Sequence, residues 1–149
     1  MTTPSMLHRQ PRSAAQVDLK ARAQIGLAAA AVSIVAVLLG QALAIALWPD
    51  IALFKPLDSY ARSAAFVLIP AIAATGIFAW LAGRREKPVR DFVILGAVVL
   101  LASFIPDYAL PDPNRTLLAS TAAAFLHLVA GIVTTGMLVS GYQRLAQQR

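Results

Sequence analysis

The sequence predicts an all-α membrane protein, with four transmembrane helices in a compact up-and-down bundle. Hydrophobic residues make up 58% of the 149 residues and charged residues only 13%, which is outside the usual range of water-soluble domains. Four long apolar stretches are separated by short polar segments. Ten of the 13 Lys and Arg residues lie in the first, third and fifth polar segments, and three lie in the other two. This positive-inside pattern predicts that both termini are cytoplasmic.

The first span is expected at about 24–48, after a basic tail over 1–22. The uncharged run 23–49 is longer than the apolar core of a signal peptide, which favours a helix retained in the mature protein. Pro49 ends this span. The loop 50–60 is rich in apolar residues, and two interpretations stay open: a turn lying in the membrane interface, or a loop packed on the helix ends.

The second span is expected at about 59–83, where Asp58 or Ser59 can cap its start. Pro70 falls near its middle and predicts a kink, because it removes one backbone hydrogen bond. A tight basic loop follows, and Pro88 suits the first turn of the third span.

The third span is expected at about 88–105. Its charge-free part, 92–106, extends only about 22 Å at 1.5 Å per residue, which is shorter than a hydrocarbon core of about 30 Å. Either its basic start dips into the headgroups, or its far end lies below the membrane surface with Asp107 at a partly buried mouth. The fourth span, at about 114–142, is expected to start with Asp112 as its cap. The transmembrane domain thus covers 23–143, and 144–149 form a short tail.

His127 is the one ionisable residue deep within a predicted span. It lies 12 residues beyond Arg115, which is about 18 Å along a helix. A polar side chain at that depth normally faces the bundle and has a partner. The candidate partners are Thr134 on the same helix and Ser33, Ser63, Thr75 and Ser103 on the others.

Two interpretations of His127 stay open. In one, the imidazole is functional: a proton relay, a ligand to haem or pigment, or a hydrogen-bonding group for a quinone. In the other, it is a neutral side chain that joins two helices. A second candidate site is an outer-mouth polar cluster of Asp107, Asp112 and Arg115, which helix caps and surface ion pairs also explain.

Several kinds of chemistry are excluded or disfavoured. The chain has no Cys, which excludes disulfides, thiolate metal sites and a Cys nucleophile. No acidic residue lies within the charge-free part of a predicted span, and neither a metal-ligand cluster nor a phosphate-binding loop is present. We therefore expect no metal site, no required cofactor and no enzyme. The charges flank apolar spans, so their partners are expected to be the bilayer and its anionic headgroups and not nucleic acid.

Two short motifs carry a family resemblance. They are Ser103-Phe-Ile-Pro106, at the outer end of span three, and Leu-His-Leu-Val-Ala over 126–130 in span four. Together with the four spans they resemble a family of small bacterial membrane proteins of unknown function that is common in actinobacteria. The resemblance covers about 24–142. It implies a four-helix fold in a bacterial inner membrane, supports attention to His127 and implies no activity.

These observations favour a non-enzymatic role. A bundle with small loops and little intramembrane polarity offers other proteins mainly its helix faces, so we expect an accessory or scaffold subunit that binds other membrane subunits or itself. The alternative is a small-molecule carrier, or a protein that binds haem, pigment or quinone through His127.

Overall fold

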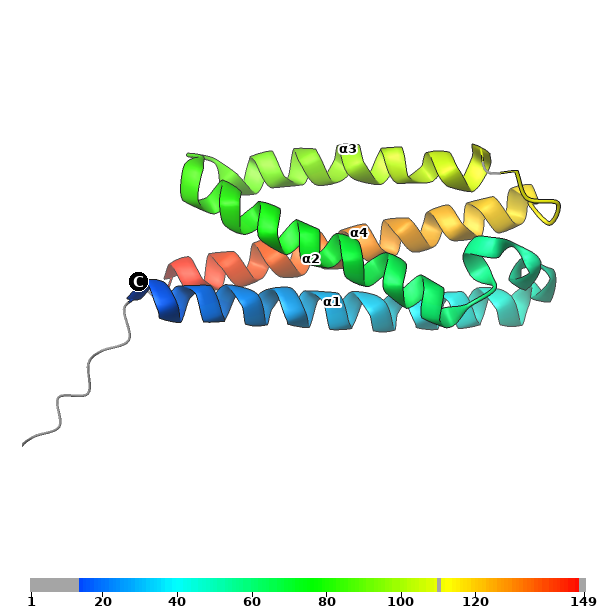
Figure 1. The fold of residues 1–149 in the computed structure, drawn as a ribbon, viewed down its shortest axis with the longest axis horizontal. Helices are drawn as coiled ribbons and strands as arrows, with labels where there is room; N and C mark the ends of the chain where they lie inside the picture. The colour runs from blue at the N-terminus through cyan, green and yellow to red at the C-terminus, as the bar shows by residue number, and fades with distance from the viewer. Residues whose placement is uncertain (1–13, 110, 148–149) are drawn as a thin grey trace, which may run out of the picture.

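The computed structural model describes residues 14–109 and 111–147, which form four long helices joined by short connections (Figure 1). The elements in chain order are α1 (Ala14–Leu47), the 3-10 helices η1 (Pro49–Leu53) and η2 (Lys55–Leu57), α2 (Tyr60–Arg84), α3 (Pro88–Ala109) and α4 (Leu117–Gln147). None of the described residues forms a strand. The predicted all-α four-helix class is therefore confirmed. Part of the predicted basic tail, 14–22, belongs to α1, and 1–13 lie outside the described residues.

Each long helix contains a segment that is long and apolar enough to cross a membrane. The shortest of these, α3, has 22 residues and extends about 33 Å, which exceeds a hydrocarbon core of about 30 Å. Only 11–22% of the most apolar window of each helix is buried inside the bundle. Most of the apolar surface therefore faces outward, as in helices solvated by lipid, and the chain has the build of a multi-pass membrane protein.

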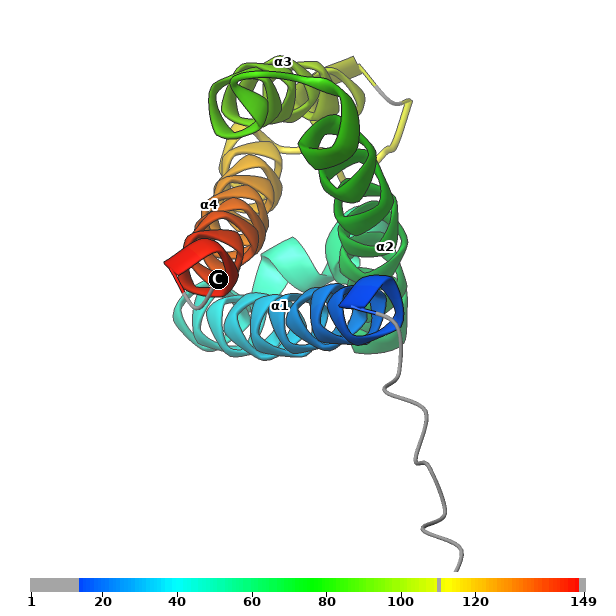
Figure 2. The same cartoon turned by 90° about the vertical axis from the view of Figure 1, so that its left-hand side faces the viewer.

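The helices run alternately up and down, so the described ends of α1 and α4 lie beside the α2–α3 connection (Figure 1). We call this the termini end, and the opposite end, which carries η1, η2 and the α3–α4 loop, the two-loop end. Seen along its length, the bundle has a four-sided outline with α3 opposite α1 (Figure 2). α2 lies against α1 at the two-loop end and tilts toward α3 at the termini end.

Small residues let α1 pack closely against its neighbours. A Cβ atom added at Gly26 would lie 2.3 Å from Cγ2 of Thr75 in α2, and one added at Gly141 in α4 would lie 2.6 Å from Cγ2 of Ile25. Both distances are far below a normal contact, so the helices can approach this closely only because these two residues lack side chains.

Polar groups inside the bundle are also used between elements. The hydroxyls of Ser33 and Thr134 are 2.8 Å apart and join α1 to α4. Gln41, which is fully buried, donates from Nε2 to the Leu57 carbonyl at 2.9 Å. In a water-poor interior such bonds satisfy groups that would otherwise be unfavourable to bury.

The segment between α1 and α2 folds back onto the bundle. Ile51, Phe54 and Leu57 are buried there and belong to one hydrophobic cluster with residues of α1, α2 and α4. These three apolar residues of the loop thus pack on the helix ends. At the start of α2, Ser59 accepts the Arg62 N–H at 3.4 Å, which is the expected cap.

At the two-loop end, two helix ends differ from the expectation. α3 continues through Pro106 to Ala109, because proline fits the helical φ angle and gives up only one backbone hydrogen bond. α4 begins at Leu117, where the hydroxyl of Thr116 accepts the Ala119 N–H at 3.1 Å. The start of α4 is therefore capped by Thr116 and not by Asp112.

Candidate functional site

Asp107 is the one ionisable side chain that is buried among the described residues, with 2% of its surface exposed. It lies two residues before the end of α3. Because Pro106 stays within the helix, Asp107 is held on a helical face against the bundle and does not project from a loop. An ionised carboxylate at this depth is unfavourable unless a partner is near, so its neighbours matter.

The partner is His127 of α4. Its Nε2 lies 3.4 Å from Oδ2 of Asp107, and the two side chains are 38% and 3% exposed, respectively. The helices are antiparallel, and each side chain leans toward the N-terminus of its own helix, so side chains from the two helices lean toward each other. Neither helix alone predicts this meeting, which depends on their relative register.

The pair is an ion pair only when the imidazole is protonated. At 3.4 Å the contact lacks hydrogen-bond geometry, and Oδ2 of Asp107 is a buried atom without a hydrogen-bond partner among the described residues. A small movement of either side chain would form a direct bond. The Nε2–Oδ2 distance would therefore shorten to that of a hydrogen bond if a proton or a further group bound between or beside the two side chains.

Side chains from α4 and the loop before it donate hydrogen bonds to free carbonyl groups at the C-terminal end of α3. The Asp107 carbonyl has no helical donor, because the residue four positions later is Pro111, which lacks an N–H. Ser120, itself 1% exposed, donates its hydroxyl to that carbonyl at 2.6 Å. Arg115 donates to the carbonyl of Tyr108. These bonds fix the C-terminal turn of α3 and so the position of the Asp107 carboxylate.

The three residues of the expected outer-mouth cluster take separate roles in the structure. Asp107 faces His127, and Arg115 binds the Tyr108 carbonyl. Asp112 accepts the N–H of Lys55 at 3.0 Å and that of Asn114 at 2.9 Å. No ion pair joins any two of the three residues. Asp112 thus ties the α3–α4 loop to η2 across the two-loop end.

The electrostatics of Asp112 follow from these contacts. The N–H groups of Lys55 and then of Asn114 donate to its carboxylate and hold its pKa below the ordinary value of an aspartate. Both bonds favour the charged form, so at neutral pH the ionised carboxylate holds the α3–α4 loop against η2.

None of the five predicted hydroxyl partners binds His127. Thr134 is paired with Ser33, as described above. The other three donate to carbonyls of their own helix: Ser63 to Ser59, Thr75 to Ala71 and Ser103 to Leu100. The partner that sequence reasoning missed is Asp107, which was expected at the mouth above the imidazole. A signal was present, since a charge-free stretch of 15 residues is too short to span the core and calls for a longer helix.

The pair can hold and exchange a proton, and it can orient an imidazole. With Nε2 directed at Asp107, the other ring nitrogen, Nδ1, is the one that a further group would meet. A carboxylate behind a histidine is also the arrangement that steadies metal-bound imidazoles. However, no group of three His, Asp or Glu side chains that would hold a metal ion occurs among the described residues.

A protein-family model matches most of the chain. DUF6069, a family of unknown function, matches residues 12–144, which is most of the chain and includes the Asp107–His127 pair. No curated protein and no protein of solved structure matches the chain.

Proposed function

The chain belongs to DUF6069, a family of unknown function, and we propose that it acts as a non-enzymatic accessory or scaffold subunit of a larger membrane complex. The main support is α3, of whose 22 residues only Phe92 and Asp107 are buried. Val98 and Leu101, with 59% and 66% of their surfaces exposed, are typical of its outward face. A helix so lightly packed in its own bundle has a large surface for a partner helix or a second copy.

The described connections between the helices are short, so a partner would meet helix faces more than loops. We place the protein in a bacterial inner membrane of the actinobacterial type, with both termini in the cytoplasm. The distribution of Lys and Arg supports this orientation. Because the chain has no Cys, single-Cys variants at Gln147 and Pro111 can be labelled in intact cells with a membrane-impermeant thiol reagent. The proposed orientation predicts labelling at Pro111 and not at Gln147, and labelling at Gln147 alone would refute it.

The subunit role is tested by cross-linking in native membranes and by mass measurement after extraction in mild detergent. The expected result is a species heavier than one chain, with cross-links concentrated on the exposed face of α3. Replacing Val98 with Trp should weaken the association, whereas Leu27→Trp on the exposed face of α1 should not. A lone monomer at every detergent concentration, with no cross-linked product in membranes, would refute the proposal.

A second function, binding of haem, pigment or quinone, is supported by the Asp107–His127 pair. The imidazole is 38% exposed and has a buried carboxylate behind it, which is a favourable arrangement for a ligand to iron or for a hydrogen bond to a quinone carbonyl. The test is the absorption spectrum of protein purified from membranes, with organic extraction to detect quinone. Bound ligand should be lost in both His127→Ala and His127→Leu, and this function is excluded if folded variants retain it.

A further inference from the structure

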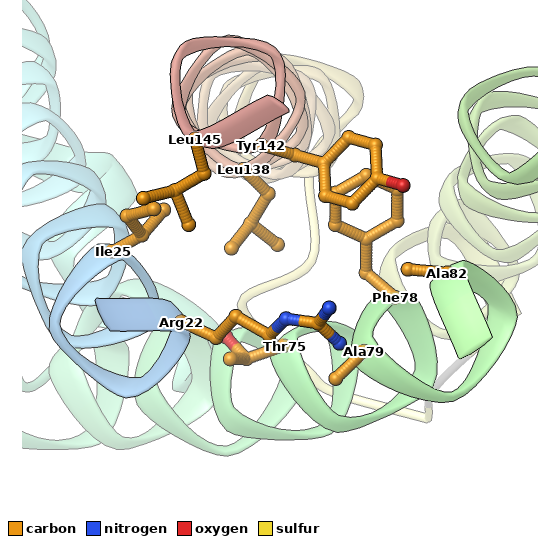
Figure 3. Close-up of a pocket in the computed structure, with 9 residues that line it drawn as sticks. All are labelled: Arg22, Ile25, Thr75, Phe78, Ala79, Ala82, Leu138, Tyr142 and Leu145. Atoms are coloured by element: carbon orange, nitrogen blue, oxygen red, sulfur yellow. The ribbon is translucent and has the colours of Figure 1, made fainter. Parts of the chain in front are cut away.

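α3 is attached to the bundle by one buried apolar side chain and one buried ionisable side chain. These are Phe92 and Asp107, which lie near opposite ends of the helix. At the termini end, the ring of Phe92 packs against that of Phe78 in α2, with centroids 4.5 Å apart. The Phe78 ring also meets that of Tyr142 in α4, with centroids 5.2 Å apart (Figure 3). This end of α3 is therefore held by aromatic packing, which requires no charge.

The two-loop end of α3 is held in a different way, through the Asp107 carboxylate. Its buried Oδ2 has no hydrogen-bond partner among the described residues and lies 3.4 Å from Nε2 of His127. One proton added to a neutral imidazole gives the pair a net charge of zero and a charge-assisted hydrogen bond. Without that proton, the pair places one negative charge in a water-poor interior, which is unfavourable. The attachment of this end therefore depends on a proton.

His127 is the member of the pair that a proton can reach. It lies seven residues, or about two turns, from both Ser120 and Thr134, so all three side chains are on one side of α4. Ser120 bonds α3 and Thr134 bonds α1, and both are buried. His127 is 38% exposed on the same bundle-facing side. The exposure shows that water has access to the imidazole between two closely packed levels.

The other bonds at the end of α3 do not involve groups that titrate near neutral pH. The Asp107 carbonyl accepts from the hydroxyl of Ser120, and the Tyr108 carbonyl accepts from Arg115. The hydroxyls of Tyr108 and Thr121 are 3.3 Å apart. Between about pH 5 and 8, imidazole is the ordinary side chain that gains and loses a proton. A response of this end in that range therefore comes from the pair.

The remaining charged groups at the two-loop end are engaged elsewhere or exposed. α1 has no charged residue between Arg22 and its end, and α4 has none before Arg144 apart from His127. No described residue except His127 forms an ion pair with Asp107. The other ionisable residues at this end are Asp50 and Tyr60, which are exposed, Asp58 paired with Arg62, and Asp112 bound to the N–H of Lys55.

We propose that Asp107 and His127 form a proton-binding site that controls how firmly the two-loop end of α3 is attached to α4. With the proton bound, the pair is joined and α3 is docked along its length. When the proton leaves as the pH rises, the buried negative charge destabilises the docked state, and this end of α3 moves outward about the aromatic contact at Phe92. The docked state holds one proton more than the released state, so the ratio of released to docked chains rises by up to tenfold per pH unit. This role requires neither a partner subunit nor a bound ligand.

The test is a distance between two spin labels on the full chain, in nanodiscs of phosphatidylcholine, measured by double electron–electron resonance. The chain has no Cys, so Ile105→Cys in α3 and Leu43→Cys in α1 carry the only labels, at exposed residues of two helices that face each other across the bundle (Figure 2). A population at longer distance should grow between about pH 5 and about pH 8. A second pair, Val93→Cys with Leu27→Cys, lies near the termini end and should keep one distance.

Three variants assign the response to the pair. Asp107→Asn and His127→Gln should each abolish the change with pH, because neither amide binds and releases a proton in this range. Asp112→Asn is the matched control, since it removes a carboxylate from the same end outside the pair, and it should respond as the wild type does. Circular dichroism confirms that each variant is folded.

Three results would overturn the proposal. The first is an Ile105–Leu43 distance that is the same at both pH values in the wild type, which needs no variant to fold. The second is an equal change in both label pairs, because the whole bundle then loosens and α3 does not move about Phe92. The third is a wild-type response in folded Asp107→Asn or His127→Gln.

Discussion

The contact of Gly26 with Thr75 permits a sharp test of how this bundle is held together. In Gly26→Ala, the new Cβ atom would lie 2.3 Å from Cγ2 and 2.6 Å from Oγ1 of Thr75. Carbon atoms in contact normally stand about 3.5–4.0 Å apart, so the overlap exceeds 1 Å. Thr75 cannot rotate away freely, because its hydroxyl is bonded to the Ala71 carbonyl at 2.8 Å. α1 and α2 must therefore separate.

Overpacking of this kind costs about 1–3 kcal/mol, and we expect the upper part of that range because the obstacle lies close to the backbone of α2. A glycine replaced by alanine in a helix gains up to about 1 kcal/mol, so the net loss is about 1–2 kcal/mol. Gly76→Ala is the matched control, since a Cβ atom there has no neighbour within 4 Å. It should be neutral or slightly stabilising.

The assay is unfolding by sodium dodecyl sulfate in mixed micelles, followed by circular dichroism, for both single variants and for Gly26→Ala combined with Thr75→Ala. The double variant removes the two nearest atoms and should recover more than half of the loss. The close contact is refuted if Gly26→Ala and Gly76→Ala change the free energy of unfolding alike, or if removing the Thr75 side chain brings no recovery.

Three further predictions concern the polar contacts. His127→Leu leaves the buried Asp107 carboxylate beside an apolar side chain and should destabilise the bundle by about 1–3 kcal/mol, most of which the added substitution Asp107→Leu restores in the same unfolding assay. Ser33→Ala should cost about 0.6 kcal/mol and no more than about 1.7, the range for hydrogen bonds between membrane helices. Because folding lowers the pKa of Asp112, its carboxylate stabilises the fold fully above about pH 4, and this stabilisation fades as the pH falls below that value. The difference in melting temperature between wild type and Asp112→Ala should therefore shrink below about pH 4 and stay constant above it.

The sequence predicted the fold class because the physical constraint is simple. A bilayer admits only hydrogen-bonded helices or closed barrels, and four long apolar runs bounded by proline and charge identify helices. Local rules also predicted the Ser59 cap of α2, which depends on neighbouring residues alone. The ends of α3 and α4 were predicted less well. Pro106 marks an end by local rules, but a helix that must reach across the bilayer continues past it.

The partner of His127 was beyond sequence reasoning for a different reason. The candidate partners were hydroxyl residues within the predicted spans, and Asp107 was placed beyond the end of span three because of the proline before it. The contact depends on the register between α3 and α4, where Ser120 bonds the Asp107 carbonyl and Gly131 lies close to Leu100. Packing of this kind is a property of two surfaces together, and no single helix pattern contains it.

A substitution in the Asp107–His127 pair distinguishes a structural role of the histidine from a functional one. If the imidazole only joins helices within one chain, Asp107→Asn should keep its shape and its interhelical contact, and both stability and association should change little. If a partner subunit or a bound quinone uses the pair, the same substitution leaves the folded monomer intact but weakens the complex or empties the ligand site, because an amide cannot accept and return a proton as a carboxylate does. Measuring unfolding, mass in mild detergent and bound chromophore on this one variant therefore tells a structural histidine from a functional one. If stability, association and bound ligand all stay unchanged in Asp107→Asn, His127 has the structural role.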